Sequence, residues 1–203
     1  MWVVKLGGSL AGSLELPTWL RCFAETGGGR LVIVPGGSSF ADAVRRAQQQ
    51  WTFPEAIAHR MALLAMDQYG WMLMGLEPRL KPASSLPEIQ DRLLAKEVPV
   101  WLPGVTIGDH PEVPQSWDVT SDSLAAWLAR VLRAEGLALV KSVSPPERDV
   151  SVTELSREGI VDAALPGFLA QADFQTVWLG PDNPAEFIRI VSGDAARTNV
   201  TRS

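Results

Sequence analysis

The sequence is poor in cysteine and in basic charge, and each scarcity excludes a class of protein. Cys22 is the one cysteine among 203 residues, so no disulfide and no cysteine metal cluster can form within the chain. Lys and Arg number 18 against 23 Asp and Glu, so a nucleic acid or an anionic membrane has no electrostatic support as a partner. We find no signal peptide and no apolar run near the roughly 20 residues that span a bilayer. We therefore expect a cytoplasmic protein with a small-molecule partner.

Strand-like and helix-like segments alternate along most of the chain. Short apolar runs predict strands at 2–6, 30–35, 98–103, 137–143 and 176–180. Longer periodic segments predict helices at 17–26, 39–50, about 54–75, 121–135 and 183–191. This alternation predicts an α/β fold with a mainly parallel open sheet between helices.

Proline and glycine gather in three stretches, which we interpret as loops rather than as a linker between domains: 78–87, 103–114 and 144–147. We therefore expect residues 1–203 to form one domain with two lobes across a cleft. In the long predicted helix, Ile57, Met61 and Leu64 recur at helical spacing, which is typical of core residues.

Two of the predicted strands end in paired glycines followed by serine. These candidate anion-binding residues are Gly7, Gly8 and Ser9, and Gly36, Gly37 and Ser38. Glycine lets backbone N–H groups approach an anion closely, and a helix N-terminus adds further donors. Neither turn matches the phosphate loop GxxxxGK[ST] or the dinucleotide fingerprint GxGxxG. The pair predicts an anion site of another kind.

Two lysines occupy settings in which a charge costs free energy without a role or a partner. Lys5 interrupts the apolar run WVVKL, and Lys141 comes near the end of LALVKSV. Phosphoryl transfer needs fixed cations, because negative charge moves from the transferred group to its leaving oxygen. A third segment, WDVTSDSLAAWLARVL, begins with polar residues, and Ser121 or Asp122 could instead simply cap the helix that follows.

Together these motifs resemble the amino acid kinase superfamily. VVKLGGSL resembles its first motif, VIVPGGSSFADAVR its second and VTSDSLAAWLA its third, with Lys141 at the place of the second catalytic lysine. The resemblance spans residues 3 to about 143. It implies a three-layer αβα sandwich that holds the acceptor in an N-terminal lobe, about 1–135, and MgATP in a C-terminal lobe, about 136–203. It also implies a homo-oligomer.

The resemblance also implies roles for individual residues. Lys5 would neutralise the transferring phosphoryl group, Lys141 would stabilise the ATP phosphates, and Asp122 would hold both ammonium groups. Gly8 and Gly37 would donate backbone N–H bonds to phosphoryl oxygens. Lys5, Ser9, Lys141 and Ser142 form the expected ATP-binding set. Mg²⁺ would be held mainly by the ATP phosphates, without metal ligands from the protein. The segment after Lys141, SVSPPERDVS, departs from the usual nucleotide loop of the family.

The stretch AHRMALLAMDQYG is similar to the small kinases of methanofuran and methylofuran biosynthesis. This similarity implies the acceptor [5-(aminomethyl)furan-3-yl]methyl phosphate, which would become its diphosphate. His59 could donate a hydrogen bond or a positive charge to the acceptor phosphate. Asp67 or Asp118 could pair with the ammonium group of the acceptor, and Trp51 and Phe53 could supply a face for the furan ring.

Two other interpretations of the sequence stay open. The acceptor could be isopentenyl phosphate, a nucleoside monophosphate or an amino acid carboxylate, with the same chemistry. The chain could also be a non-catalytic anion-binding or regulatory homologue. The joint presence of Lys5, Lys141 and Asp122 argues against that second possibility, because storage of an anion does not need two lysines and a carboxylate that organises them.

Overall fold

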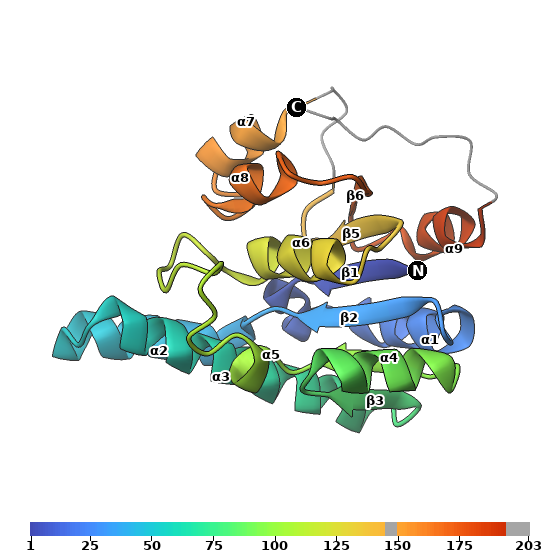
Figure 1. The fold of residues 1–203 in the computed structure, drawn as a ribbon, viewed down its shortest axis with the longest axis horizontal. Helices are drawn as coiled ribbons and strands as arrows, with labels where there is room; N and C mark the ends of the chain where they lie inside the picture. Colours follow the sequence, from blue (N-terminus) through green and yellow to red (C-terminus); the bar gives the residue numbers. More distant parts are fainter. Residues whose placement is uncertain (145–149, 194–203) are drawn as a thin grey trace.

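The computed structural model describes residues 1–144 and 150–193. These residues contain a six-stranded sheet (Figure 1). Its strands are β1 (Trp2–Leu6), β2 (Leu31–Pro35), β3 (Leu80–Ala83), β4 (Val98–Trp101), β5 (Gly136–Val140) and β6 (Gln175–Leu179). Their order is β3-β4-β2-β1-β5-β6, and neighbouring strands are parallel. The predicted α/β fold with a parallel open sheet is confirmed.

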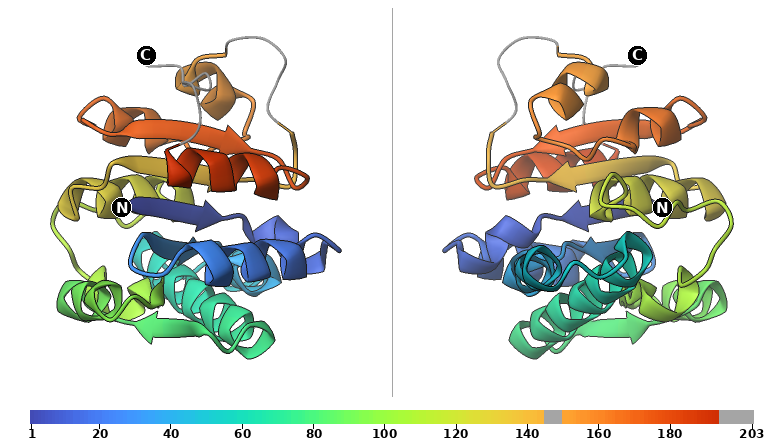
Figure 2. Two further views of the ribbon diagram at one scale, coloured as in Figure 1. Left: turned by 90° about the vertical axis from the view of Figure 1, so that its right-hand side faces the viewer. Right: turned by 90° about the vertical axis from the view of Figure 1, so that its left-hand side faces the viewer.

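Helices cover both faces of this sheet (Figure 2). They are the 3-10 helix η1 (Gly8–Gly12), α1 (Leu16–Thr26), α2 (Ser38–Trp51), α3 (Glu55–Leu76), α4 (Leu86–Leu94), α5 (Pro103–Thr106), α6 (Ser121–Val131), α7 (Val152–Arg157), α8 (Leu165–Leu169) and α9 (Pro184–Ser192). One buried core joins α1, α9 and part of α3 to one face, and a second joins α4, α6 and α8 to the other. The molecule is thus an αβα sandwich.

The two-residue period of a strand decides where both lysines point. On β1, Val4 packs in the core beside α1, whereas Val3 packs in the core beside α6, so Lys5 also faces α6. On β5, Leu139 belongs to the α6 core, and Lys141 follows it by two residues. Because Lys5 pairs with Leu139 across the parallel ladder, the two lysines reach the same face of the sheet on adjacent strands.

The predicted loop at 78–87 is wrong, because this stretch contains β3 and the start of α4. Pro82 is tolerated in β3 because the described strand pairs on one side only, with β4, and an edge strand can do without one N–H group. The stretch 103–114 likewise contains α5. Residues 145–147 of the third predicted loop lie outside the described residues.

The expectation that Ile57, Met61 and Leu64 belong to the core is also wrong. Their exposed fractions are 49%, 37% and 51%. α3 carries apolar residues on more than one face, and its other side buries Leu63 and Met66. Helical spacing shows that residues share a face, but it does not show which face is inward.

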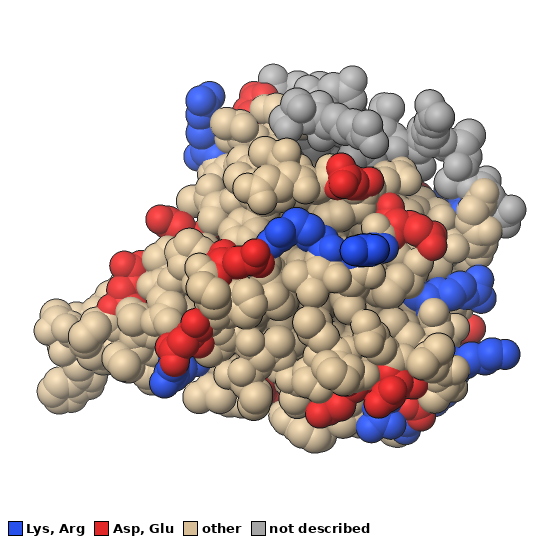
Figure 3. Space-filling model, in the orientation of Figure 1, with Lys and Arg blue, Asp and Glu red and all other residues tan. Residues whose placement is uncertain are grey.

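The charged side chains show no separation by sign on the surface drawn in Figure 3, where acidic and basic residues are interspersed. In the described part of the chain, no helix has the length and apolar character needed to cross a membrane.

The division into two lobes near residue 135 stays a prediction. The strands on either side of that point, β1 and β5, pair directly in one sheet.

Candidate active site

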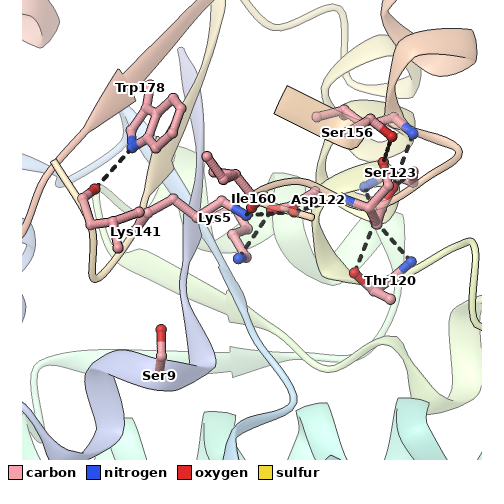
Figure 4. A network of polar contacts seen from close by, with 12 residues as sticks. Lys5, Ser9, Thr120, Asp122, Ser123, Lys141, Ser156, Ile160 and Trp178 are labelled. Atoms are coloured by element: carbon pink, nitrogen blue, oxygen red, sulfur yellow. Dashed lines mark hydrogen bonds and ion pairs between the residues drawn. The ribbon is translucent and has the colours of Figure 1, made fainter. Parts of the chain in front are cut away.

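The Asp122 carboxylate lies between the ammonium groups of Lys5 and Lys141 (Figure 4). Lys5 Nζ is 3.0 Å from Asp122 Oδ1, and Lys141 Nζ is 2.5 Å from Asp122 Oδ2. The Lys5 contact is an ion pair without the alignment of a hydrogen bond, because Oδ1 has no hydrogen-bond partner among the described residues. All three residues are at most 8% exposed. The structure thus brings the predicted catalytic residues together.

This cluster carries two positive charges and one negative charge away from water. Burial by itself would raise the pKa of the Asp122 carboxyl, but the Lys5 and Lys141 charges outweigh it and hold that pKa below its usual value. Burial and the nearby Lys5 charge lower the pKa of Lys141 to about 8. An excess positive charge therefore remains at the carboxyl ends of β1 and β5, where an anionic ligand would be stabilised.

The segment between α7 and α8 supports the cluster from the side opposite the sheet. Lys141 Nζ donates to the Ile160 carbonyl oxygen at 2.9 Å, and the Asp162 N–H donates to Asp122 Oδ2 at 3.3 Å. Both partners of the Lys141–Asp122 pair are thus fixed by the same short segment. The sequence analysis did not single out this segment.

Asp162 also caps helix α6. Its carboxylate accepts 2.9 Å hydrogen bonds from the N–H and hydroxyl of Thr120 and from the Ser123 N–H, and it also accepts one from the Ser123 hydroxyl. The interpretation of Ser121 or Asp122 as the cap is therefore wrong, and Asp122 is free to pair with the lysines. An acidic residue alone in the apolar stretch GIVDAALPG was the one sequence signal for Asp162.

The two glycine turns meet backbone to backbone. A Cβ atom on Gly8 would lie 2.2 Å from the Ser38 nitrogen, and one on Gly36 would lie 2.3 Å from the Gly8 nitrogen, so side chains are excluded from both positions. Ser38 has a left-handed φ of 52°, which is uncommon for a residue other than glycine. The turns therefore have a tightly constrained shape.

Only some of the glycine N–H groups in these turns are available to a ligand. Gly7 N–H donates to Val140 O and Gly36 N–H donates to Leu6 O, each at 2.9 Å, so both are used within the sheet. Gly8 and Gly37 stand at the starts of η1 and α2, where a helix provides no acceptor for the N–H group. No other acceptor contacts them in the described residues. The structure thus leaves the predicted phosphate donors, Gly8 and Gly37, free to bind an anion.

The remaining predicted ATP-binding residues lie at the same edge of the sheet. The Ser9 hydroxyl donates to the Ser142 hydroxyl at 2.8 Å, which links the turn after β1 to the residues after β5. Trp178 of β6 donates from Nε1 to the Val143 carbonyl oxygen at 3.2 Å. Part of the divergent segment SVSPPERDVS, residues 145–149, lies outside the described residues.

A cavity of about 660 Å³ adjoins the glycine turns, and its wall includes Gly8, Gly37 and Ser38. Helix α2 contributes Arg45 to the wall, and the segment before α6 contributes Trp117. The Arg45 guanidinium carbon lies 4.3 Å from the centroid of the Trp117 ring, a favourable cation–π geometry. The cavity wall therefore combines the unpaired N–H groups of the glycine turns with a cation and an aromatic ring.

His59 of α3 belongs to the wall of this cavity and is 3% exposed. Its Nδ1 lies 3.2 Å from the Ser116 carbonyl oxygen, whereas Nε2 is buried and has no partner in the described part of the chain. Burial lowers the pKa of His59, although the Ser116 carbonyl and Glu55 act in the opposite direction. The structure thus places His59 in the wall of the cavity, with one ring nitrogen unpaired.

Four other candidates do not line the cavity. Asp67 accepts a hydrogen bond from the Gly104 N–H at 3.1 Å, and Asp118 is exposed outside the wall. Trp51 is 70% exposed, and Phe53 also lies outside the wall. The aromatic wall residues Phe40 and Trp117 were not singled out from the sequence, although Phe40 belongs to the second motif and Trp117 opens the segment WDVTSDSLAAWLARVL.

The described residues contain no group of three or more His, Cys, Asp or Glu side chains arranged to hold a metal ion.

Comparison with known proteins identifies the family of the chain. The family model described as "Amino acid kinase family" matches residues 1–145, which include all three motifs, Lys5, Asp122 and Lys141. The chain belongs to the amino acid kinase family. A kinase of [5-(aminomethyl)furan-3-yl]methyl phosphate from Methanocaldococcus jannaschii is 26% identical over 144 residues, which are 70% of this chain and 66% of that relative. The match therefore spans slightly less than two thirds of the relative.

Solved structures of the same fold come from kinases of small phosphorylated molecules. Uridylate kinase from Archaeoglobus fulgidus has a TM-score of 0.72 at 16% identity, covering 96% of each chain. An isopentenyl phosphate kinase has a TM-score of 0.63 at 15% identity, covering 97% of this chain and 98% of its own. These likenesses confirm the amino acid kinase fold. The named relative and the fold neighbours are all kinases, in agreement with the predicted enzyme class.

Proposed function

We propose that the chain is an ATP-dependent kinase that phosphorylates the phosphate group of a small acceptor. The observation that carries this proposal is the buried cluster of Lys5, Asp122 and Lys141 beside the free N–H groups of Gly8 and Gly37. Such an arrangement stabilises a phosphoryl group in transit by charge and position alone, without a covalent intermediate on the protein. Family membership supports the same reaction class.

In the proposed step, an oxygen of the acceptor phosphate attacks the γ-phosphorus of ATP. The bond from that phosphorus to the β–γ bridging oxygen breaks, and ADP leaves with the electron pair. Lys5 and the Gly8 and Gly37 N–H groups stabilise the transferred phosphoryl group, while Lys141 stabilises charge on the leaving ADP. Asp122 holds the two ammonium groups against their mutual repulsion. Mg²⁺ arrives with the ATP phosphates.

The acceptor that we propose is [5-(aminomethyl)furan-3-yl]methyl phosphate, which becomes its diphosphate. The relative from Methanocaldococcus jannaschii supports this choice, because it is a kinase of that compound by name. A cavity of about 660 Å³ with an aromatic wall is large enough for a phosphorylated furan. Uridylate and isopentenyl phosphate are the alternatives suggested by the names of the fold neighbours.

We further propose that the acceptor binds in the half of the chain before about residue 135. Its phosphate would lie at the glycine turns, with Ser38 beside it. ATP would bind on the other side of Lys5, against Lys141, Ser9 and Ser142. The direct pairing of β1 with β5 supports this arrangement, because it brings the two phosphate sites to adjacent strand ends.

The proposal is tested by incubating the purified protein with MgATP and four separate acceptors: the aminomethylfuran phosphate, isopentenyl phosphate, uridylate and acetylglutamate. Mass spectrometry detects each phosphorylated product. We expect a diphosphate from the furan compound and much less product from the other acceptors. A diphosphate formed mainly from uridylate or isopentenyl phosphate would overturn the acceptor and keep the reaction class. No product from any acceptor, together with no binding of MgATP by calorimetry, would favour an anion-binding or regulatory role.

A further inference from the structure

The imidazole ring of His59 has its two nitrogens in different situations. Nδ1 lies 3.2 Å from the Ser116 carbonyl oxygen. A carbonyl oxygen only accepts hydrogen bonds, so Nδ1 must carry the hydrogen of this contact. In the neutral ring, Nε2 then has a lone pair and no hydrogen. The unpaired nitrogen of His59 is therefore a hydrogen-bond acceptor.

Nε2 receives no hydrogen bond from the described part of the protein. Nε2 is buried, the His59 side chain belongs to the wall of the cavity, and no described residue contacts Nε2 with a donor. The other residues that α3 contributes to the wall include Ala62, Leu63 and Met66, which are apolar and supply no donor. Buried polar atoms in proteins are nearly always paired, so an unpaired one at a cavity points to a ligand that supplies the missing group.

We infer that His59 recognises a hydrogen-bond donor on the acceptor, an ammonium or hydroxyl group that is separate from the phosphate that is phosphorylated. This inference rests on the proposed function, because it concerns the acceptor of that reaction. The phosphate has other candidate donors in the wall, the Gly8 and Gly37 N–H groups. A neutral imidazole accepts from an ammonium group without repelling it.

This role differs from the one that the sequence suggested. A histidine that donates to a phosphate needs a free N–H group, and the N–H group of the neutral His59 ring is already directed at Ser116. Burial lowers the pKa of His59, which opposes the second proton that would make Nε2 a donor. The structure therefore favours a role in which neutral His59 accepts a hydrogen bond from a donor group of the substrate. It does not favour a role in which charged His59 neutralises the substrate phosphate.

Two matched ligands test the inference by calorimetry without ATP: [5-(aminomethyl)furan-3-yl]methyl phosphate and (5-methylfuran-3-yl)methyl phosphate, which lacks the amine. We expect the wild-type protein to bind the amine about 10- to 100-fold more tightly, as is typical of a hydrogen bond to a charged group. Equal affinities would overturn the inference.

Two substitutions distinguish the roles of the two ring nitrogens of His59. In His59→Asn, the side-chain amide can still donate to Ser116, but no atom remains at the place of Nε2, so we expect the preference for the amine to disappear. In His59→Gln, the longer amide can place its oxygen near that point, so we expect part of the preference to return. An equal loss of affinity for both furan phosphates in His59→Asn would contradict a role in recognising the amine.

Nuclear magnetic resonance gives a readout that does not depend on turnover. The chain has two histidines, so long-range ¹H–¹⁵N correlations of ¹⁵N-histidine-labelled protein, with His110→Gln for assignment, report the tautomer of His59. We expect a hydrogen on Nδ1 and none on Nε2, both before and after the amine ligand is added. A hydrogen on Nε2 in either state would overturn the inference.

Failure of the proposed acceptor can be distinguished from failure of this inference. If neither furan phosphate binds, the acceptor assignment is wrong, and uridylate and isopentenyl phosphate form the next pair. Uridylate carries hydroxyl and imide donors, whereas isopentenyl phosphate has none beyond its phosphate. A loss of affinity in His59→Asn that is confined to uridylate would support the inference. A loss for isopentenyl phosphate would overturn it.

Discussion

Lys141 Nζ lies 2.5 Å from Asp122 Oδ2, and both residues are buried at the carboxyl end of a parallel strand pair. A buried ion pair contributes little net stability compared with apolar packing. Its presence here, with a second lysine on the other carboxylate oxygen, is therefore better explained by function than by folding.

Replacing Lys5 should remove catalysis and leave the fold in place. In Lys5→Ala, Asp122 keeps its contact with Lys141, but the charge beside the transferred phosphoryl group is lost. We expect kcat to fall by about 10²- to 10³-fold, as is typical when one transition-state contact is removed. Steady-state kinetics with circular dichroism measures this effect. Lys96→Ala removes an exposed lysine and serves as the control, which should keep wild-type kcat. Near-normal turnover in Lys5→Ala would refute the role of Lys5.

Replacing Asp122 should affect both turnover and stability. Asp122→Asn leaves two buried ammonium groups without a countercharge, and breaking a buried pair in this way costs about 3–5 kcal/mol. Chemical denaturation measures the stability, and single-turnover kinetics measures the phosphoryl transfer step, which we expect to slow by orders of magnitude. An unchanged rate of transfer would leave Asp122 with a purely structural role.

The low pKa of Lys141 predicts how activity depends on pH. Lys141 is protonated below about 8, so the charge that stabilises the leaving ADP is present there and is lost as the pH rises through that value. We expect kcat/KM for ATP to fall above about pH 8, since kcat/KM reports the free enzyme. Bound ATP phosphates raise the pKa of Lys141, so kcat should fall at a higher pH than kcat/KM. A kcat/KM that stays constant up to pH 10 would contradict this assignment.

Asp162 should act on catalysis through the position of Asp122. Asp162→Ala removes the cap of α6, which we expect to cost about 0.5–2 kcal/mol of stability. It should also reduce kcat while the KM for ATP changes little. Ser85→Ala is the matched control, because Ser85 caps α4 by accepting from the Glu88 N–H, on a helix outside the cluster. Equal kinetic effects of the two cap removals would show that Asp162 contributes to stability alone.

The glycine turns should not tolerate even one added carbon. A Cβ atom on Gly8 would lie 2.2 Å from the Ser38 nitrogen, a backbone atom that cannot move independently of α2. We expect Gly8→Ala to abolish turnover and to lower the melting temperature. Gly75→Ala is the control, since a Cβ there meets no atom within 4 Å and alanine favours a helix. A Gly8→Ala protein with wild-type melting temperature and turnover would contradict the close approach of the two turns.

The sequence was sufficient to predict the fold and the position of the two buried lysines, because those features follow from local patterns. A lysine within an apolar strand, a glycine pair at a strand end and the alternation of strands with helices are each visible in short stretches. Lys5 and Lys141 came together because parallel strands place their carboxyl ends at one edge of the sheet. The expectation of Asp122 beside them came from the family resemblance, and this residue lies in the first turn of α6.

The rest of the site depends on tertiary contacts that no short stretch contains. Asp162 reaches α6 from 39 residues further along the chain than Ser123, and Trp117 contacts Arg45 across the cavity. The outward face of α3 was misassigned for the same reason, because Ile57 and Leu63 are both apolar and only the packing of α3 shows which is buried. The choice of donor and acceptor nitrogen on His59 likewise depends on Ser116, 57 residues away.

Side chains alternate between the two faces of the sheet along β1, so the face on which Lys5 lies depends on whether its position in the strand is odd or even. Removing one residue between Val3 and Lys5, with the pairing to β5 otherwise kept, would turn the lysine away from Asp122 and into the core that contains Trp19 and Phe187. Removing both Val3 and Val4 would restore its direction but place the lysine two residues nearer the start of the strand. Natural variants of this chain should therefore keep the spacing from the start of β1 to Lys5 even where the identities of Trp2, Val3 and Val4 change.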